Sequence, residues 1–170
     1  MIFHISKKIQ NEFDRNLKDW YLGGPKDNGW TRTGPAIKEK QAKLINYSFI
    51  NISIDEVLAK NYIETEKWHM DFLRNMQNIV DTRYYSEYLC PRYKGLSINR
   101  ANYFINLVKD IELNGVRKPV WVADVEDLKM GFKYFRFNGC HRACALKFIG
   151  KKEIFAIVFK TCFNDTNNAN

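Results

Sequence analysis

Residues 132–149 read FKYFRFNGCHRACALKFI, and this stretch decides which fold class the sequence predicts. Its first part is rich in aromatic residues, which is typical of a β-strand. Its second part follows a helical pattern. Gly139 separates the two patterns, and glycine is the residue that most readily adopts the backbone angles of a tight turn. The stretch therefore predicts a strand, a turn at Gly139, and a helix from Cys140 to Ile149.

Two further elements precede this stretch. Apolar residues recur at helical spacing after Ser97, and Gly115 provides the left-handed position at which a helix commonly ends. Residues 120–123 then have the pattern of a strand, and an acidic turn joins them to residues 132–137. Two strands joined in this way predict a β-hairpin that leads directly into the glycine turn.

The elements that follow and precede these complete a sheet. Gly150 ends the predicted helix, and residues 154–159 are apolar on both faces, as an interior strand is. Residues 44–52 alternate like a strand, and Ser53 with Glu56 forms a capping box for a short helix. The sequence therefore predicts an α+β (mixed α/β) fold, with a small mixed sheet flanked by helices.

The remaining segments decorate this fold. Residues 5–21 place apolar side chains four apart, as an amphipathic helix does, whereas residues 22–36 are rich in glycine and proline and form a loop. Residues 65–79 predict another helix, which ends before the aromatic, proline-containing residues 84–93. We expect an amino-terminal helix and loop extension (1–43), a main domain (44–162) with a helical insertion at about 60–96, and a flexible tail (163–170).

Composition restricts the class of protein and its partners. The 170 residues include 27 Lys and Arg against 19 Asp and Glu, which gives a net charge of +8. Such a balance favours polyanionic partners: nucleotides, nucleic acid or an acidic protein. No apolar run has the length that crosses a membrane, so we expect no membrane association and a cytoplasmic location. The four cysteines lack CxxC spacing, so neither a disulfide framework nor a metal site is predicted.

The residues around Gly139 have the chemistry of an anion site. Glycine allows a ligand to approach the backbone, and the amides at the start of the following helix are unpaired donors with partial positive charge. An arginine two residues beyond Cys140 could add charge-assisted hydrogen bonds to a phosphate. The predicted nucleotide-binding residues are Asn138, Gly139, Cys140, His141 and Arg142, with Arg117 and Lys118 as candidates for the rim.

The order of elements and the sequence Gly-Cys-His-Arg at residues 139–142 resemble the fold shared by ParB amino-terminal domains and sulfiredoxins. The resemblance covers residues 97–160 well and reaches residues 44–52 loosely. Asn138 stands where sulfiredoxins have a first glycine. That family carries a lysine and small hydroxyl residues for ATP on the preceding helix, whereas the matching stretch here is Tyr103-Phe104-Ile105-Asn106 and then Lys109-Asp110, so those contacts are not expected. The resemblance implies binding of a nucleotide, ATP or CTP with Mg²⁺, whose phosphates lie on the helix that begins at Cys140.

The same resemblance names candidates for catalysis. Cys140 would be a nucleophile if the helix start and Arg142 lower the pKa of its thiol, and sulfiredoxins use the matching cysteine in this way. His141 could carry a proton or contact a terminal phosphate. We expect phosphoryl transfer or nucleotide hydrolysis; the alternatives are a DNA-associated ParB-like protein without catalysis and a sulfiredoxin-type cysteine sulfinic acid reductase. Cys140 could also be a packing residue, and Cys144 is interpreted as part of the core.

Overall fold

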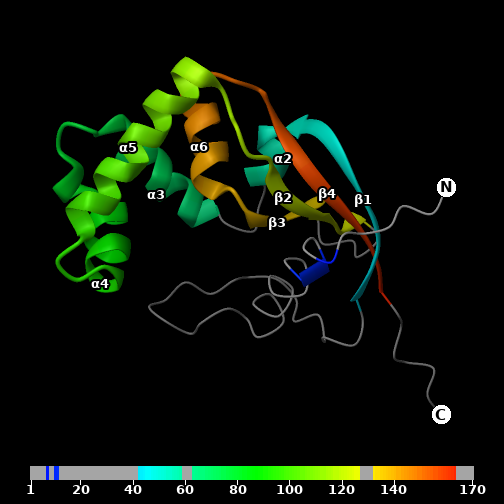
Figure 1. The fold of residues 1–170 in the computed structure, drawn as a ribbon. Coiled ribbons are helices and arrows are strands. Elements are labelled where there is room, and N and C mark those ends of the chain that lie inside the picture. The colour runs from blue at the N-terminus through cyan, green and yellow to red at the C-terminus, as the bar shows by residue number, and fades with distance from the viewer. Residues whose placement is uncertain (1–6, 8–9, 12–41, 59–62, 127–131, 164–170) are drawn as a thin grey trace, which may run out of the picture.

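The computed structural model describes residues 42–58, 63–126 and 132–163, together with Lys7, Gln10 and Asn11. The structure is mixed α+β, as the sequence predicts, and a mixed sheet is flanked by helices (Figure 1). Within these residues, no helix combines the length and the apolar composition needed to cross a bilayer. The predicted loop over residues 22–36, most of the predicted amino-terminal helix, and residues 164–170 lie outside the described residues.

The sheet contains four strands in the order β1-β4-β2-β3. Strand β4 pairs with β1 in antiparallel and with β2 in parallel orientation, and β2 with β3 forms the predicted hairpin. Strand β4 lies inside the sheet, and its residues 156–159, which alternate between the two faces, are all buried, whereas Phe155 is 43% exposed. The strands are β1 (Ala42–Ser53), β2 (Val120–Asp124), β3 (Tyr134–Asn138) and β4 (Glu153–Phe163).

Helices gather on one face of the sheet, where α6 lies between α5 and the strands (Figure 1). The predicted ends of the helices after Ser97 and after Gly139 are confirmed, because Gly115 and Gly150 follow α5 and α6 with φ angles of 73° and 79°. The helical elements are α2 (Ile54–Leu58), α3 (Ile63–Arg74), a 3-10 turn η3 (Ile79–Asp81), a π-helix η4 (Tyr84–Leu89), α4 (Cys90–Arg92), α5 (Ser97–Asn114) and α6 (Cys140–Phe148).

One prediction in the helical insertion is wrong. Helix α3 ends at Arg74 rather than near residue 79. At this end, the side-chain amide of Asn75 donates hydrogen bonds to both the main-chain carbonyl and the carboxylate of Asp71. Residues 84–92, which lie in the predicted helical insertion but received no element of their own, are also helical. Pro91 has no amide hydrogen for a regular α-helical ladder, and a wider π-helical turn precedes it.

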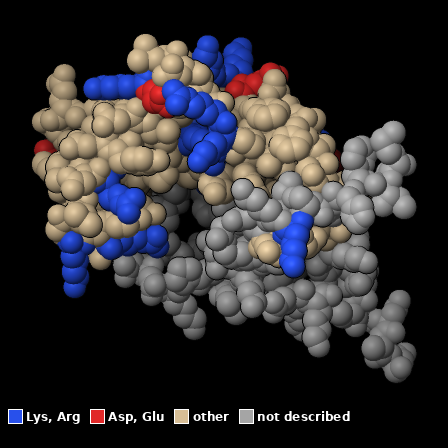
Figure 2. Space-filling view, in the orientation of Figure 1, with Lys and Arg blue, Asp and Glu red and all other residues tan. Residues whose placement is uncertain are grey.

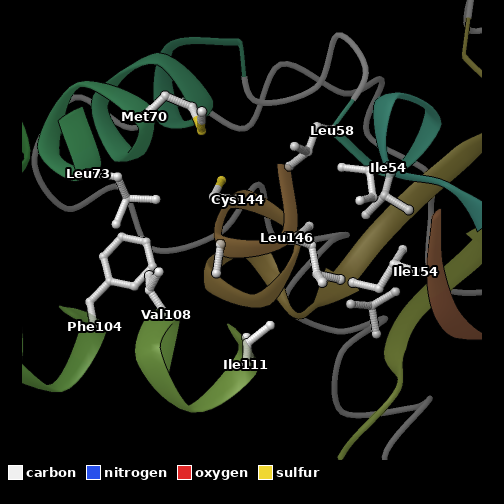
Figure 3. Close-up of a cluster of buried hydrophobic side chains, with 14 of the residues drawn as sticks. Ile54, Leu58, Met70, Leu73, Phe104, Val108, Ile111, Cys144, Leu146 and Ile154 are labelled. Carbon is white, nitrogen blue, oxygen red and sulfur yellow. The ribbon is translucent and has the colours of Figure 1, made fainter. Parts of the chain in front are cut away.

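The core lies between the sheet and the helices, and α6 runs through its centre. Figure 3 shows that side chains from α2, α3, α5, α6 and β4 converge there. Phe104 of α5 is 1% exposed, and Cys144 of α6 is fully buried. Burying a large apolar side chain contributes about 1.5–3 kcal/mol, so this packing fixes the position of α6 firmly. The interpretation of Cys144 as a core residue is confirmed.

Candidate functional site

The turn at Gly139 joins the end of β3 to the start of α6 and presses against the neighbouring strand. Gly139 has φ 103° and ψ 18°, a left-handed conformation that L side chains rarely adopt. A Cβ atom at this position would lie 2.4 Å from Cγ1 of Val120, the first residue of β2. The backbone angle and the lack of room beside Val120 therefore both require glycine at residue 139. The turn lies at the position that the sequence predicts.

Arg142 fastens this corner to the segment that enters β2. Its Nη1 donates hydrogen bonds to the carbonyl oxygens of Lys118 and Pro119, at 2.6 and 2.5 Å, and its Nη2 donates to Oδ1 of Asn138 at 3.2 Å. From the sequence we predicted that the guanidinium of Arg142 binds a phosphate. In the structure these bonds go to protein oxygens instead, because the chain brings two main-chain carbonyl groups within reach of its planar fork.

A cavity of about 470 Å³ opens beside the start of α6, and we call it the helix-start cavity. All seven residues predicted to bind the nucleotide line it, although Arg117 and Lys118 precede the others by some twenty positions in the chain. Helix α5 supplies the facing wall. The lining residues are Tyr103, Leu107, Asp110, Ile111, Gly115, Val116, Arg117, Lys118, Asn138, Gly139, Cys140, His141 and Arg142.

The start of α6 carries unused donors next to this cavity. The carbonyl of Gly139 accepts the first helical hydrogen bond, from the amide of Ala143. Within the described segments, no protein group accepts from the amides of Cys140, His141 and Arg142. These donors remain for water or for a ligand, and they carry the partial positive charge of the helix start.

Charge on the cavity rim is only partly compensated. Arg117 donates to a carboxylate oxygen of Asp110 at 3.2 Å, and both side chains are substantially exposed. Asp110 also accepts from the side-chain amide of Asn114 at 2.8 Å. Asp110 is the one acidic residue among the lining residues, against Arg117, Lys118 and Arg142. The balance of charge around the cavity therefore favours an anion.

His141 is held against the helical insertion and is neutral. Its Nε2 and the hydroxyl of Tyr84 are 2.6 Å apart, and the two residues are 57 positions apart in the chain. Burial, with the charges of Arg136 and Arg142, lowers the pKa of His141 to about 4. Burial also raises the pKa of Tyr84, so the phenol stays protonated. At pH 7 His141 is therefore uncharged, so a contact with a terminal phosphate, one of its two predicted roles, would be that of a neutral imidazole.

Cys140 has the lowered pKa that the sequence predicts, for a different reason. The pKa of its thiol falls to about 7 because Cys144 forms a hydrogen bond with it and Arg136 lies nearby, against the opposing effect of burial. Arg142, the predicted cause, is not among these groups. The bond to Cys140 and burial raise the pKa of Cys144 well above its usual value. The groups that stabilise a thiolate at Cys140 are therefore Cys144 and Arg136, on the side of α6 that faces the core.

Three residues near the candidate site were not predicted from the sequence. His69 of α3 packs against His141 with ring centroids 4.8 Å apart, and Tyr84 begins the π-helix. Arg136 of β3 is only 6% exposed, and its Nη1 donates to the carbonyl of Val57 at 3.1 Å. One signal was available: His69 precedes Phe72 by three positions, so a titratable ring falls on the apolar face of a predicted helix.

No protein-family model, curated protein or solved structure matches this chain significantly. The relation to ParB domains and sulfiredoxins therefore stays a prediction. A function has to be argued from the geometry and chemistry of the site itself.

Proposed function

We propose that this protein binds a nucleotide in the helix-start cavity, with the phosphates on the amides of Cys140, His141 and Arg142. The observation that carries the proposal is the combination of these unused donors with a cavity whose rim holds Arg117 and Lys118. Amides at a helix start bind phosphate oxygens without further help, and two cations on the rim strengthen the attraction.

The rest of the lining suits the other parts of a nucleotide. Tyr103, Leu107 and Val116 offer aromatic and apolar surface on the wall opposite the amides, where a base can lie flat. The volume of about 470 Å³ falls in the range of about 300–1,000 Å³ that is usual for small-molecule cavities. A ligand with an anionic end and a flat apolar end therefore matches the cavity better than inorganic phosphate alone.

The chemistry that we infer is phosphoryl transfer or nucleotide hydrolysis, with ATP or CTP as the nucleotide. Mg²⁺ prefers oxygen ligands, and Asp110 is the one carboxylate in the lining, so phosphate oxygens and water would supply most of the coordination. His141 is a weak base with a pKa of about 4. Positioning of the phosphates and neutralisation of their charge would therefore account for most of the catalysis.

A second candidate function rests on Cys140. Its thiol lines the same cavity, and a pKa of about 7 leaves a large fraction as thiolate at neutral pH. A thiolate beside a bound triphosphate is what a sulfiredoxin-type sulfinic acid reductase requires. This candidate predicts that Cys140→Ser abolishes reduction of a sulfinylated peroxiredoxin while nucleotide binding persists. Absence of reduction by the unmodified protein would exclude it.

The third possibility, a DNA-associated protein without catalysis, lacks a comparable observation. Figure 2 shows basic side chains in several separate groups on the face in view, with acidic side chains beside some of them. A continuous basic surface is the usual footprint of a nucleic-acid partner. On the face in view, the basic side chains of the described residues do not form one continuous surface.

The nucleotide proposal is tested by thermal denaturation and calorimetry with ATP, ADP, CTP and GTP in the presence of Mg²⁺. The deciding variant is Arg117→Ala/Lys118→Ala, which leaves the main-chain carbonyl that Arg142 uses in place. The matched control is Lys151→Ala/Lys152→Ala, which removes the same charge from exposed residues beyond the far end of α6.

We expect at least one nucleotide to raise the melting temperature, since binding at about 100 times Kd stabilises a fold by about 2.7 kcal/mol. The rim variant should weaken that nucleotide at least about tenfold, which corresponds to about 1.4 kcal/mol, and the control should bind like the unmodified protein. Equal affinities for the two double variants, or no response to any nucleotide at millimolar concentration, would refute the proposal.

A further inference from the structure

Behind the helix-start cavity, three side chains with metal-binding atoms meet inside the protein. The side chains are His69 of α3 with Cys140 and Cys144 of α6, and their potential ligand atoms all lie within 4.8 Å of one another. His69 and Cys144 are buried, and Cys140 is partly buried. Among the described residues, this is the group of histidines, cysteines and acids whose geometry could hold a metal ion.

Two of the three ligands are arranged by the helix itself. Cys140 and Cys144 are four residues apart, so their side chains lie on the same face of α6, one turn apart. Their sulfur atoms lie within 4.8 Å of each other. In Figure 3 the side chain of Cys144 points from α6 towards α3, the helix that carries His69.

The separations fit a single small ion after a modest contraction. Zn²⁺ binds sulfur at about 2.3 Å and imidazole nitrogen at about 2.0–2.1 Å, so its tetrahedral ligands lie roughly 3.5–3.8 Å apart. The present limit of 4.8 Å exceeds this by about one ångström. Small rotations of two cysteines and one histidine supply such a change, and all three belong to packed helices that fix their approach.

The chemistry of the ligands selects the kind of ion. Thiolate and imidazole favour Zn²⁺ or Cu⁺, whereas Mg²⁺ and Ca²⁺ require oxygen ligands. Two thiolates neutralise a divalent ion, which makes a buried site acceptable in a low dielectric. A buried oxygen-binding ion would find none of these advantages.

We propose that His69, Cys140 and Cys144 bind a thiophilic metal ion, with Zn²⁺ as the first candidate. Three protein ligands leave one coordination position for water or for a substrate atom, as in catalytic zinc sites. Of the three ligands, Cys140 alone lines the helix-start cavity, so an outside ligand would reach the ion from the cavity. The proposal goes beyond nucleotide binding and does not depend on it.

The test uses the full chain, purified with a reducing agent and stripped of metal, and titrated with Co²⁺ as a spectroscopic probe. Binding to thiolates gives a sulfur-to-cobalt charge-transfer band in the near ultraviolet, and tetrahedral coordination gives intense visible bands. We expect saturation at about one Co²⁺ per chain and loss of both bands when Zn²⁺ is added, because Zn²⁺ binds such sites more tightly.

Cys140→Ser is the deciding variant, because this side chain is only partly buried and serine has nearly the same shape. It should weaken Co²⁺ at least about 100-fold, since loss of a direct ligand costs more than the 10–100-fold typical of an outer partner. The matched control is Cys90→Ser, a partly buried free cysteine of α4 outside the group. This control should keep both bands and the same affinity.

Substitution of His69 or Cys144 also disturbs the core, so circular dichroism must first show that those variants fold. Three results would overturn the proposal: no cobalt bands in the unmodified protein, equal affinity in Cys140→Ser, or bands retained in a folded His69→Asn. The Arg117→Ala/Lys118→Ala variant must still bind Co²⁺, which separates this outcome from failure of the nucleotide proposal.

Discussion

Replacement of Gly139 by alanine tests the corner on which both sites depend. The backbone there has φ 103°, and a left-handed conformation costs an L residue about 1–2 kcal/mol. The new methyl group would also lie 2.4 Å from Cγ1, 2.9 Å from Cβ and 3.2 Å from Cα of Val120. Val120 is fully buried in the core, so it cannot move aside without a cost of about 1–3 kcal/mol for overpacking.

The two contributions predict that Gly139→Ala lowers the free energy of unfolding by about 2–5 kcal/mol. Gly150→Ala is the matched control, because its φ of 79° carries a similar backbone cost but no atom lies within 4 Å of the added Cβ. We expect the control to lose only about 1–2 kcal/mol. Urea denaturation, with the slope compared between variants, measures both values.

A double-mutant cycle then isolates the contact with the strand. Val120→Ala removes Cγ1, the closest atom, so it should cost less in the Gly139→Ala protein than in the unmodified protein. Rescue is partial, because Cβ and Cα of residue 120 remain close. Equal losses for the two glycine variants, or additivity within about 0.5 kcal/mol in the cycle, would refute the steric argument.

Two further predictions concern the charged and titratable residues of the site. Arg142→Ala should lower the free energy of unfolding by about 2–4 kcal/mol, because three protein oxygens lose a charged donor. Arg117→Ala removes only an exposed ion pair, so it should cost less than about 1 kcal/mol. Thermal denaturation of the two variants compares these losses. The pKa of His141 is about 4 in the folded state and lies near its ordinary value of 6.5 in the unfolded chain. Between these two pH values the unfolded state binds more protons than the folded state. The free energy of unfolding should therefore fall as the pH drops from 6.5 to 4. The loss should reach about 2 kcal/mol between pH 8 and pH 5, and urea midpoints of His141→Asn should lack this part of the slope; an unchanged slope would contradict it.

Much of the fold could be predicted because its signals are local. The strand pattern before Gly139, the helical pattern after it, and the glycines that end α5 and α6 each depend on a few neighbouring residues. Backbone angles with positive φ leave this kind of trace in a sequence, since glycine adopts them at the lowest cost. The apolar run at residues 156–159 of β4 likewise reports burial on both faces of the strand.

The partners inside the site could not be predicted, because long-range packing brings them together. The hydroxyl of Tyr84 reaches His141 across 57 positions, and Arg136 reaches the carbonyl of Val57 across 79. Neither distance leaves a periodic signal in the sequence. The helical insertion, which shows no resemblance to the suggested family, supplies both His69 and Tyr84 to the site.

One error was avoidable, and it separates the two proposed sites. Cys140 and Arg142 are two residues apart on a helix, and residues at that spacing do not face each other, whereas Cys140 and Cys144 do. Arg142 and the two thiols therefore lie on different sides of α6. The hydrogen bonds agree: Arg142 donates to the segment that enters β2, whereas Cys140 bonds to Cys144 on the core side. A single turn of helix can thus present free amides to an anion at its end and two sulfur ligands to a metal ion on its flank. Since the rim cations belong to one site and the thiols to the other, a variant of either kind should affect its own ligand alone, unless the ligands meet at Cys140.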